Sequence, residues 1–522
     1  MAGIYSSKKN IGGQKMKKIT AILLSVTMGL TFIGCNGQTS RNDTGGQPTK
    51  SQDLNESKYA PGGEVVGEIT VSCYDTISYK NFLDEAAKAF EEKYPGTKVN
   101  IETFSQMPDV KSQTVGGKTI MVIGKGEDNA QATDDYINKI NTELMSGEGA
   151  DIIAIDVIPY YKYVDSGQLE NLNSYMELDE SFQINDYFVN IFNAAKYKEG
   201  QYFLPIDYTF DYLSFDSSLF SESEQKPLLE NDLFSYEQLI ELGQQPYLNV
   251  NKVGEKDQVE MFGIFAQELF NKMWKENYNQ FIDIEARTVN LNDGDFANLL
   301  NKVRDYEDRG YIKQGTKNKL GEASMGAFEK NKLEQYFYKA NSSFSLLQFL
   351  NKDSKRKFGS TSQGNQENDI IAGQIEGNDG VVPYTYEQAY GLNSNSTNKT
   401  TAWAFMKFLA SEEMQTSLNL FGIPVNKNAL AEKTKLDITG QLFEPAGNEL
   451  KTTELTSEQL EIYNNYMKVL GELSDRINTF FVQDTTINSI IDKEVENFFN
   501  GSKTSEEVTD ILQNKIELYL SE

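Results

Sequence analysis

Residues 69–104 read ITVSCYDTISYKNFLDEAAKAFEEKYPGTKVNIETF, and their pattern predicts a strand, a helix and a second strand. The apolar run 69–73 is typical of a buried strand, and residues 99–104 form the second candidate strand. Between them, apolar residues recur at helical spacing until Tyr94-Pro95-Gly96 stops the helix. The apolar residues of this helix are Phe82, Ala86, Ala89 and Phe90.

The next fifty residues continue the alternation. A helix is predicted from Ile137, Ile140 and Leu144, glycines end it, and a short buried strand follows at 152–155. Strands that alternate with helices favour an α/β fold with a mostly parallel sheet and helices on both faces. Ligands of such sheets bind beyond the carboxyl ends of the strands. The candidate rim loops are therefore Tyr74-Asp75-Thr76 and Asp156-Val157-Ile158.

Three further segments have a legible local structure. Apolar residues on one face predict a helix over 401–420, and Thr504 with Glu507 forms a capping box before a C-terminal helix. Gly117-Lys118-Thr119 resembles the end of a phosphate loop, but strand-like residues 120–123 follow it, so a hairpin turn is predicted instead.

The N-terminus has the layout of an export signal. Lys17 and Lys18 precede an uncharged apolar run that ends at Cys35, and this run is shorter than the ~20 residues of a membrane span. Phe32-Ile33-Gly34-Cys35 resembles a bacterial lipobox, which predicts a lipid-modified Cys35 after removal of the signal, with Met1 or Met16 as the start. The polar, glycine-rich segment 36–63 is predicted to be a flexible tether. We therefore expect an extracytoplasmic protein anchored to the cell membrane.

Composition narrows the range of functions. The formal net charge of −28 disfavours nucleic acid as a partner, because binding to phosphates requires clustered lysine and arginine, and it favours a soluble monomer. The sequence has no histidine, which removes catalysis by Ser-His-Asp or Cys-His and the commonest zinc ligand. If Cys35 carries lipid, Cys73 is left alone and is expected to be a small buried residue. We expect no cofactor and no metal.

Several blocks of sequence, in order, resemble the extracellular solute-binding proteins of bacterial ABC importers, and in particular the carbohydrate-binding members. The early blocks are FEEKYPGTKV (90–99), LMSGEGADII (144–153), GQLENL (167–172), GQYFLP (200–205) and LSFD (213–216). The late blocks are YGLN (390–393), AWAFMKFL (402–409) and GIPV (422–425). Residues 107–131 depart from the family pattern as an insertion.

The resemblance implies a periplasmic-binding-protein fold, in which two α/β lobes joined by a hinge close over a ligand. Lobe 1 is then expected at 64–208 plus 390–430, and lobe 2 at 209–389 plus 431–522, after a signal peptide at 1–35. The implied function is capture of a sugar or oligosaccharide for delivery to the permease subunits of an importer. A peptide or another small solute is an alternative ligand. A surface glycosidase with paired carboxylates is an alternative function, and so is a sensor or adhesion module of the same fold that hands its ligand to a receptor.

Polar and aromatic residues beside the predicted strand ends and crossings are the candidate ligand contacts, because sugars bind to acceptors beside aromatic faces. The first lobe and the crossing contribute Tyr74, Asp75, Asp156, Tyr160, Asp207, Tyr208 and Asp211, and the second lobe contributes Trp274, Tyr336 and Tyr384. For the acids of the crossing, a role in capping turns is an equal alternative. For Trp274, a place in the core is as well supported as stacking on a sugar. Trp403, on a helix that resembles a core element of the family, is predicted to be packing.

Overall fold

A computed structural model describes residues 62–74, 77–104, 110–115, 118–123, 129–251, 259–315, 335–351, 368–439 and 454–522. The predicted signal and lipobox, the predicted tether up to residue 61, and Asp75 and Thr76 lie outside these residues. Within the described residues, no helix is both long enough and apolar enough to cross a membrane. The residues from Glu56 onward form one compact unit that contains two main sheets.

The first sheet has five strands, and its core is the strand–helix–strand unit predicted from the sequence. β1 (Gly67–Tyr74) lies between β2 (Thr97–Phe104) and β5 (Ile152–Ala154), and both neighbours run parallel to it. β17 (Ala389–Leu392) pairs antiparallel with β5 and with β6 (Leu204–Pro205), so a late segment of the chain completes the early sheet.

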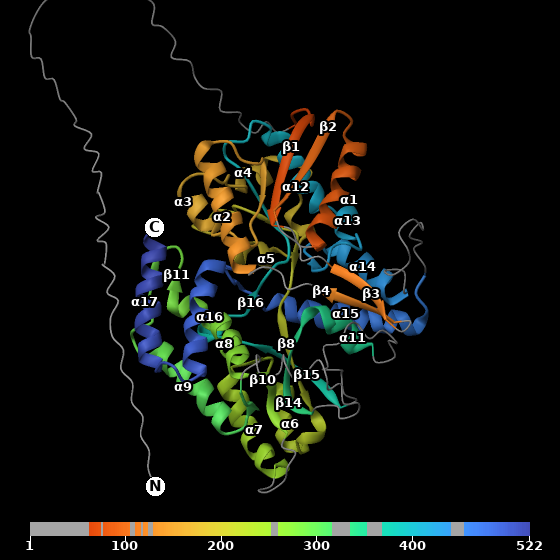
Figure 1. Cartoon of the computed structure of the whole chain (residues 1–522). Coiled ribbons are helices and arrows are strands. Elements are labelled where there is room, and N and C mark those ends of the chain that lie inside the picture. The colour runs from red at the N-terminus through yellow and green to blue at the C-terminus, as the bar shows by residue number, and fades with distance from the viewer. Residues whose placement is uncertain are drawn as a thin grey trace, which may run out of the picture. The chain divides into compact units, whose positions relative to one another are not determined.

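The helices of this half follow the predicted apolar spacing. α1 (Ile77–Lys93) buries Phe82, Ala86 and Phe90 completely, and Gly96, with a φ of 98°, provides the turn into β2. Figure 1 shows α1 and α12 beside β1 and β2. The other helices are α2 (Asn129–Ser146), α3 (Tyr160–Asp165), α4 (Asn173–Leu178), α5 (Val189–Ala194), α12 (Lys399–Leu409) and α13 (Glu412–Gln415). The single helix expected over 401–420 is thus wrong in extent, because Ser411 caps a separate helix.

The second sheet has six strands in the order β13-β10-β14-β8-β15-β9. β10 runs parallel to β13 and β14, and β8 runs antiparallel between β14 and β15. The strands are β8 (Asp211–Asp216), β9 (Leu233–Phe234), β10 (Glu260–Phe265), β13 (Ile312–Lys313), β14 (Tyr336–Ser342) and β15 (Asp369–Ile375). The helices that accompany them are α6 (Glu222–Glu230), α7 (Tyr236–Val250), α8 (Ala266–Phe281), α9 (Asp295–Asp308) and α11 (Leu346–Leu350).

Short ladders join the chain segments that pass between the two sheets. β7 (Asp207–Tyr208) pairs with β18 (Ile423–Pro424), and β16 (Pro383–Tyr384) pairs with β19 (Thr479–Phe480). The C-terminal region adds α14 (Lys427–Thr439), α15 (Ser457–Asp475), α16 (Thr485–Phe499) and α17 (Ser505–Ser521). α17 starts at the predicted capping box, in which Thr504 Oγ1 accepts a hydrogen bond from the Glu507 amide.

Two hairpins complete the described elements. β3 (Val110–Val115) and β4 (Lys118–Ile123) pair antiparallel within the segment that looks inserted, which confirms the predicted hairpin in place of a phosphate loop. β11 (Ile282–Asp283) and β12 (Thr288–Val289) form the second hairpin, directly after α8.

Candidate functional site

The carboxyl ends of the first sheet bring aromatic and acidic side chains together. Tyr74 ends β1, and its ring centroid lies 5.7 Å from that of Tyr136 on α2. Asp156 follows β5 by two residues, and Tyr160 begins α3 as a buried ring, 5.1 Å from Phe203. Three of the predicted first-lobe residues thus lie on or just after the strands named from the sequence.

Asp156 stands out by its environment. Its Oδ1 atom is buried and has no hydrogen-bond partner among the described residues. Burial is the main cause that raises the pKa of Asp156 to about 7, against the opposing effect of nearby backbone amides and of the Tyr79 side chain; the negative charge of Glu387 adds to the rise. An unsatisfied buried acceptor costs roughly 1–3 kcal/mol, and a ligand hydroxyl that donated a hydrogen bond to it would remove that cost.

Asp207 and Tyr208 hold the crossing segments together. Asp207 Oδ1 accepts hydrogen bonds from the backbone amides of Glu387 (2.8 Å) and Gln388 (3.0 Å), and Oδ2 accepts one from Gly422 (3.3 Å). Burial raises the pKa of this fully buried carboxyl to about 7. The Tyr208 hydroxyl lies 2.8 Å from Ser474 Oγ. The contacts of Asp207 with backbone amides fit the alternative stated above, in which the acids of the crossing cap turns.

Asp211 occupies the first position of β8, where the chain enters the second sheet. Its carboxylate pairs with Lys272 of α8 at 2.9 Å. Burial alone would raise the pKa of Asp211, but the positive charges of Lys272 and Lys275 hold it below its ordinary value. Asp211 therefore stays ionised and fixes α8 against the start of β8.

The three aromatic residues predicted for the second lobe are all buried. Trp274 packs between the rings of Phe270 and Phe281, in nearly parallel orientation to both. Tyr336 leaves no room for a side chain at position 263, which is glycine, and the Tyr384 hydroxyl donates to the carbonyl of Ile191. Trp403, expected as packing, is also buried, and its indole donates to Asp179.

Phe344, an exposed aromatic residue beside the second sheet, was not predicted as a ligand contact. Phe344 follows the end of β14 by two residues and keeps 45% of its surface exposed. A separate contact joins α8 to α16: Gln267 and Asn271, near the start of α8, donate hydrogen bonds to the backbone and side chain of Asp492. An aromatic residue in the polar stretch Asn341-Ser342-Ser343 was the signal that could have revealed Phe344.

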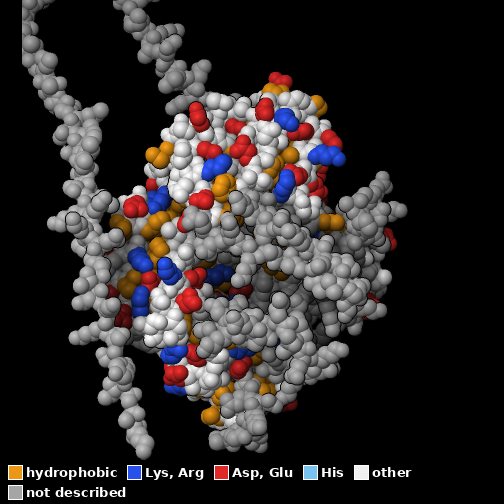
Figure 2. Space-filling model, in the orientation of Figure 1, with side chains coloured by type: hydrophobic (Ala, Val, Ile, Leu, Met, Phe, Trp, Pro, Cys, Tyr) orange, Lys and Arg blue, Asp and Glu red, His pale blue; other side chains and the backbone are white. Residues whose placement is uncertain are grey.

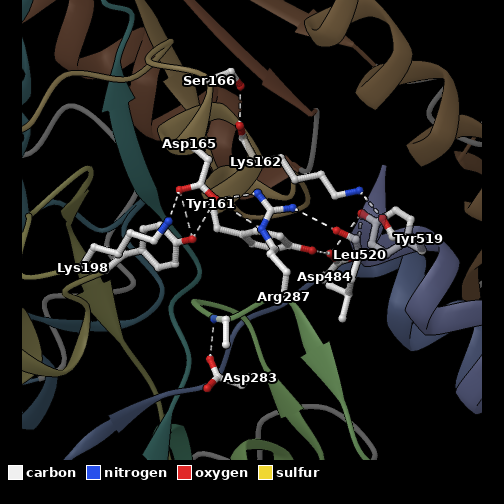
Figure 3. A network of polar contacts seen from close by, with 12 residues as sticks. Tyr161, Lys162, Asp165, Ser166, Lys198, Asp283, Arg287, Asp484, Tyr519 and Leu520 are labelled. Carbon is white, nitrogen blue, oxygen red and sulfur yellow. Dashed lines mark hydrogen bonds and ion pairs between the residues drawn. The ribbon is translucent and has the colours of Figure 1, made fainter.

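A polar network, shown in Figure 3, joins the first half to the second. Arg287, in the β11–β12 hairpin, pairs with Asp165 of α3 at 2.8 Å, and Lys198 pairs with the other carboxylate oxygen at 2.6 Å. The Arg287 guanidinium also lies 4.7 Å from the centroid of the Tyr161 ring. Although partial burial opposes the charge, hydrogen bonds from Lys198 and Arg287 hold the pKa of Asp165 below its ordinary value. We call these contacts of Asp165, Lys198 and Arg287 the interlobe clamp.

The segment that carries Asp156 is also tied to the C-terminal helices. The Tyr161 hydroxyl donates to Asp484 at 2.6 Å, and the Thr485 hydroxyl donates to the carbonyl of Val157 at 3.0 Å. Lys162 reaches the carbonyl of Tyr519 at 2.7 Å. A cavity of about 880 Å³ lies beside these contacts, with α2, α3, Arg287 and α17 among its walls.

Both turns of the clamp have a left-handed backbone at residues other than glycine. Lys198 and Glu199 have φ angles of 47° and 63°, and Arg287 has 56°. The amide of Lys198 donates to Glu285 at 2.9 Å, so the two turns contact each other directly. Such conformations cost about 1–3 kcal/mol each and persist where the surrounding contacts hold them.

Charged groups of both signs alternate on the face seen in Figure 2. Lys and Arg side chains lie between Asp and Glu side chains over its coloured part, without an extended basic patch there. Among the described residues, no cluster of three or more cysteine or acidic side chains could hold a metal ion. What the site offers is a set of hydrogen-bond acceptors and aromatic faces.

Comparison with known proteins identifies the family. A model of the bacterial extracellular solute-binding proteins matches residues 125–416, more than half of the chain. The chain belongs to this family. Comparison with curated proteins finds no match to this solute-binding protein.

Solved structures show its fold. The sugar-binding protein MalE of Xanthomonas citri matches with a TM-score of 0.55 and 11% identity, over 87% of this chain and 98% of that one. A family 1 solute-binding protein of Alicyclobacillus acidocaldarius matches with 0.52 and 13%, over 89% and 100%. An ABC substrate-binding protein of Listeria monocytogenes, in complex with cycloalternan, matches with 0.50 and 16%, over 87% and 99%.

These matches confirm the two-lobed periplasmic-binding-protein fold expected from the sequence blocks. The two main sheets of this solute-binding protein belong to its two lobes, and the chain crosses between them near Asp207 and Gln388. The family is one of binding proteins rather than of enzymes.

Proposed function

We propose that this protein captures a sugar or oligosaccharide between its two lobes and delivers it to an ABC importer. Family membership supports the capture of a solute. Two structures of the same fold come from a sugar-binding protein and from a protein in complex with cycloalternan. Solutes of this class present many hydroxyl donors, which suits the acceptors and aromatic rings at the strand ends.

The buried, unpartnered Oδ1 of Asp156 is the observation that carries the proposal. Asp156 lies directly after β5, at the edge of the sheet where ligands of α/β proteins bind. A hydroxyl of the ligand would supply the missing donor, and Tyr74 and Phe344 would offer aromatic faces from the two lobes. Because this oxygen is buried, the lobes must open to admit the ligand.

The same proposal includes the anchoring of the protein. Residues 1–35 act as the signal, Cys35 carries the lipid, and 36–63 tether lobe 1 (64–208 plus 390–430) and lobe 2 (209–389 plus 431–522) outside the membrane. The partners are then a small-molecule ligand, the membrane through the lipid, and the permease subunits of the importer. The resemblance of 32–35 to a lipobox supports the anchor.

A thermal-shift screen against oligosaccharides tests the function. We expect a glycan to raise the melting temperature of the wild-type protein, and Asp156→Asn to weaken its binding at least tenfold, because the amide group removes a charged acceptor. Asp186→Asn, an exposed acid in the same half, is the matched control and should bind like the wild type. If peptides shift the melting temperature and glycans do not, the ligand class proposed here is wrong.

A further inference from the structure

A cavity of about 250 Å³ lies in the second lobe, away from the proposed ligand contacts. All the residues that line it fall between 235 and 378, so closure of the lobes is not needed to form it. The start of α7 contributes Ser235, Tyr236 and Glu237, and the segment after β15 contributes Glu376, Gly377 and Asn378. The remaining wall is formed by side chains of α8 and α9.

Two polar side chains in its wall are buried and incompletely satisfied. Glu276 is 4% exposed and Tyr236 is 3% exposed, and neither Glu276 Oε2 nor the Tyr236 hydroxyl has a hydrogen-bond partner in the described part of the chain. A buried polar group without a hydrogen-bond partner is destabilising, and a ligand that supplies the partner removes this cost. Both groups line the same cavity, so one ligand could satisfy both.

The excess of carboxyl groups in the cavity wall favours a cationic ligand. Four carboxyl groups and one ammonium group line the cavity, and the ammonium group of Lys302 is already paired with Glu237 at 2.6 Å. Gln280, a neutral side chain, donates to Asp295 at 2.8 Å. Glu276, Asp295 and Glu376 form no ion pair with a described lysine or arginine, although the charges of Lys272 and Lys275 act on Glu276. Met273, Phe281 and Leu299 supply an apolar patch in the same wall.

The backbone holds Glu276 at this place. A Cβ atom at position 377 would overlap the carbonyl oxygen of Glu276, so the glycine lets the segment after β15 pack directly on α8. The Asn378 amide donates to the Asn277 side chain at 2.9 Å. The segment after β15 thus holds the α8 backbone at Glu276, which carries the carboxyl group into the cavity wall.

We propose that this cavity is a second binding site, which takes a small aliphatic ammonium group. The ammonium group donates to Glu276 Oε2 and to the Tyr236 hydroxyl oxygen, and the short alkyl chain lies against Met273, Phe281 and Leu299. The site is independent of the sugar site proposed above, since none of its residues is a proposed sugar contact.

The binding should be coupled to the ionisation of Glu276. Burial is the main cause that raises the pKa of Glu276 to about 8, so the group is mostly neutral at pH 7. The charges that act on it come from Lys272 and Lys275 on α8 and from Asp211 on β8, while Tyr236 of α7 and the four other charged groups of the wall face the cavity. A cation binds best to the ionised carboxylate, so it should displace a proton.

Calorimetry with n-propylammonium chloride tests the site, with n-propanol and propionate as neutral and anionic probes of the same length. We expect only the ammonium probe to bind, with an affinity that rises about tenfold from pH 7 to pH 9 as Glu276 ionises. The probe keeps its charge in this range, because alkylammonium groups titrate near pH 10, as lysine does. The binding heat at pH 7 is measured in two buffers with different heats of ionisation, and its difference gives the number of protons released on binding.

The variants separate this site from a cavity that holds only water. Glu276→Gln should weaken binding and remove its pH dependence, and Tyr236→Phe should weaken binding but keep the pH dependence. Glu241→Gln, an exposed acid on α7 outside the cavity, is the control and should leave binding unchanged. Equal weak binding of all three probes, or unchanged binding in Glu276→Gln, would overturn the proposal, whatever the outcome of the glycan screen.

Discussion

Asp156 combines a functional benefit with a cost to folding. Its buried carboxyl has a pKa of about 7, well above the value near 4 expected in an unfolded chain. The folded state therefore holds the proton more tightly than the unfolded state between about pH 4 and pH 7. The contribution of this residue to stability is most favourable below pH 4, falls as the pH rises through this window, and stays low above it.

Asp156→Asn should therefore stabilise the protein at pH 8 while it weakens the binding of the ligand. We expect the free energy of unfolding at pH 8 to rise by about 4 kcal/mol, because the pKa shift is about three units and each unit corresponds to about 1.4 kcal/mol. Urea unfolding at pH 4 and pH 8 measures the change, which should shrink at the lower pH. A variant that is less stable than the wild type at both values would contradict this account.

Local sequence determines several elements, while burial decides the role of individual side chains. The apolar spacing of Phe82, Ala86 and Phe90 predicted α1, because short-range periodicity fixes which face of a helix is buried. Trp274 was less accessible to this reasoning, although Phe270 and Phe281 lie on the same face of α8 and mark it as a core stripe. The exposure of Phe344 could not be predicted from the sequence, because it depends on contacts between distant segments.

The capping box of α17 gives a prediction of known size. Thr504→Ala removes the acceptor for the Glu507 amide and should lower the free energy of unfolding by about 1 kcal/mol. Denaturant titration measures the loss. Ser489→Ala, at an exposed position within α16, is the control and should change stability by less than about 0.5 kcal/mol.

The interlobe clamp acts on the molecule as a whole, because it joins α3, which follows the first sheet's β5, to the β11–β12 hairpin, which follows α8. The fold itself was predictable from short blocks such as 90–99 and 144–153, which lie around the strands of the first sheet. The clamp was not, since Asp165, Lys198 and Arg287 are far apart in the sequence and follow no periodic pattern. Partly exposed ion pairs contribute only about 0–1 kcal/mol to stability, so its main effect should be on the balance between open and closed lobes.

Arg287→Ala should shift the unliganded protein toward an open form. We expect a larger radius of gyration in small-angle scattering and a lower affinity for the ligand, because closure gains less free energy without the contacts to Asp165. Asp84→Asn breaks an ion pair within α1 and is the matched control. Identical scattering of Arg287→Ala and the wild type would show that the clamp does not set this balance.

The buried acids determine how the stability of this protein depends on the pH of its surroundings. The sequence has no imidazole. Among the described residues, proton uptake near pH 7 to 8 therefore falls mainly to three carboxyl groups that burial has made weak acids, Asp156, Asp207 and Glu276, and to the ammonium group of Lys433, whose pKa burial lowers to about 8. Each of these carboxyl groups stabilises the folded chain when it is protonated. Acidification of the surroundings toward pH 5 should therefore raise the free energy of unfolding. These carboxyl groups alone would then keep the chain folded when its surroundings become acidic.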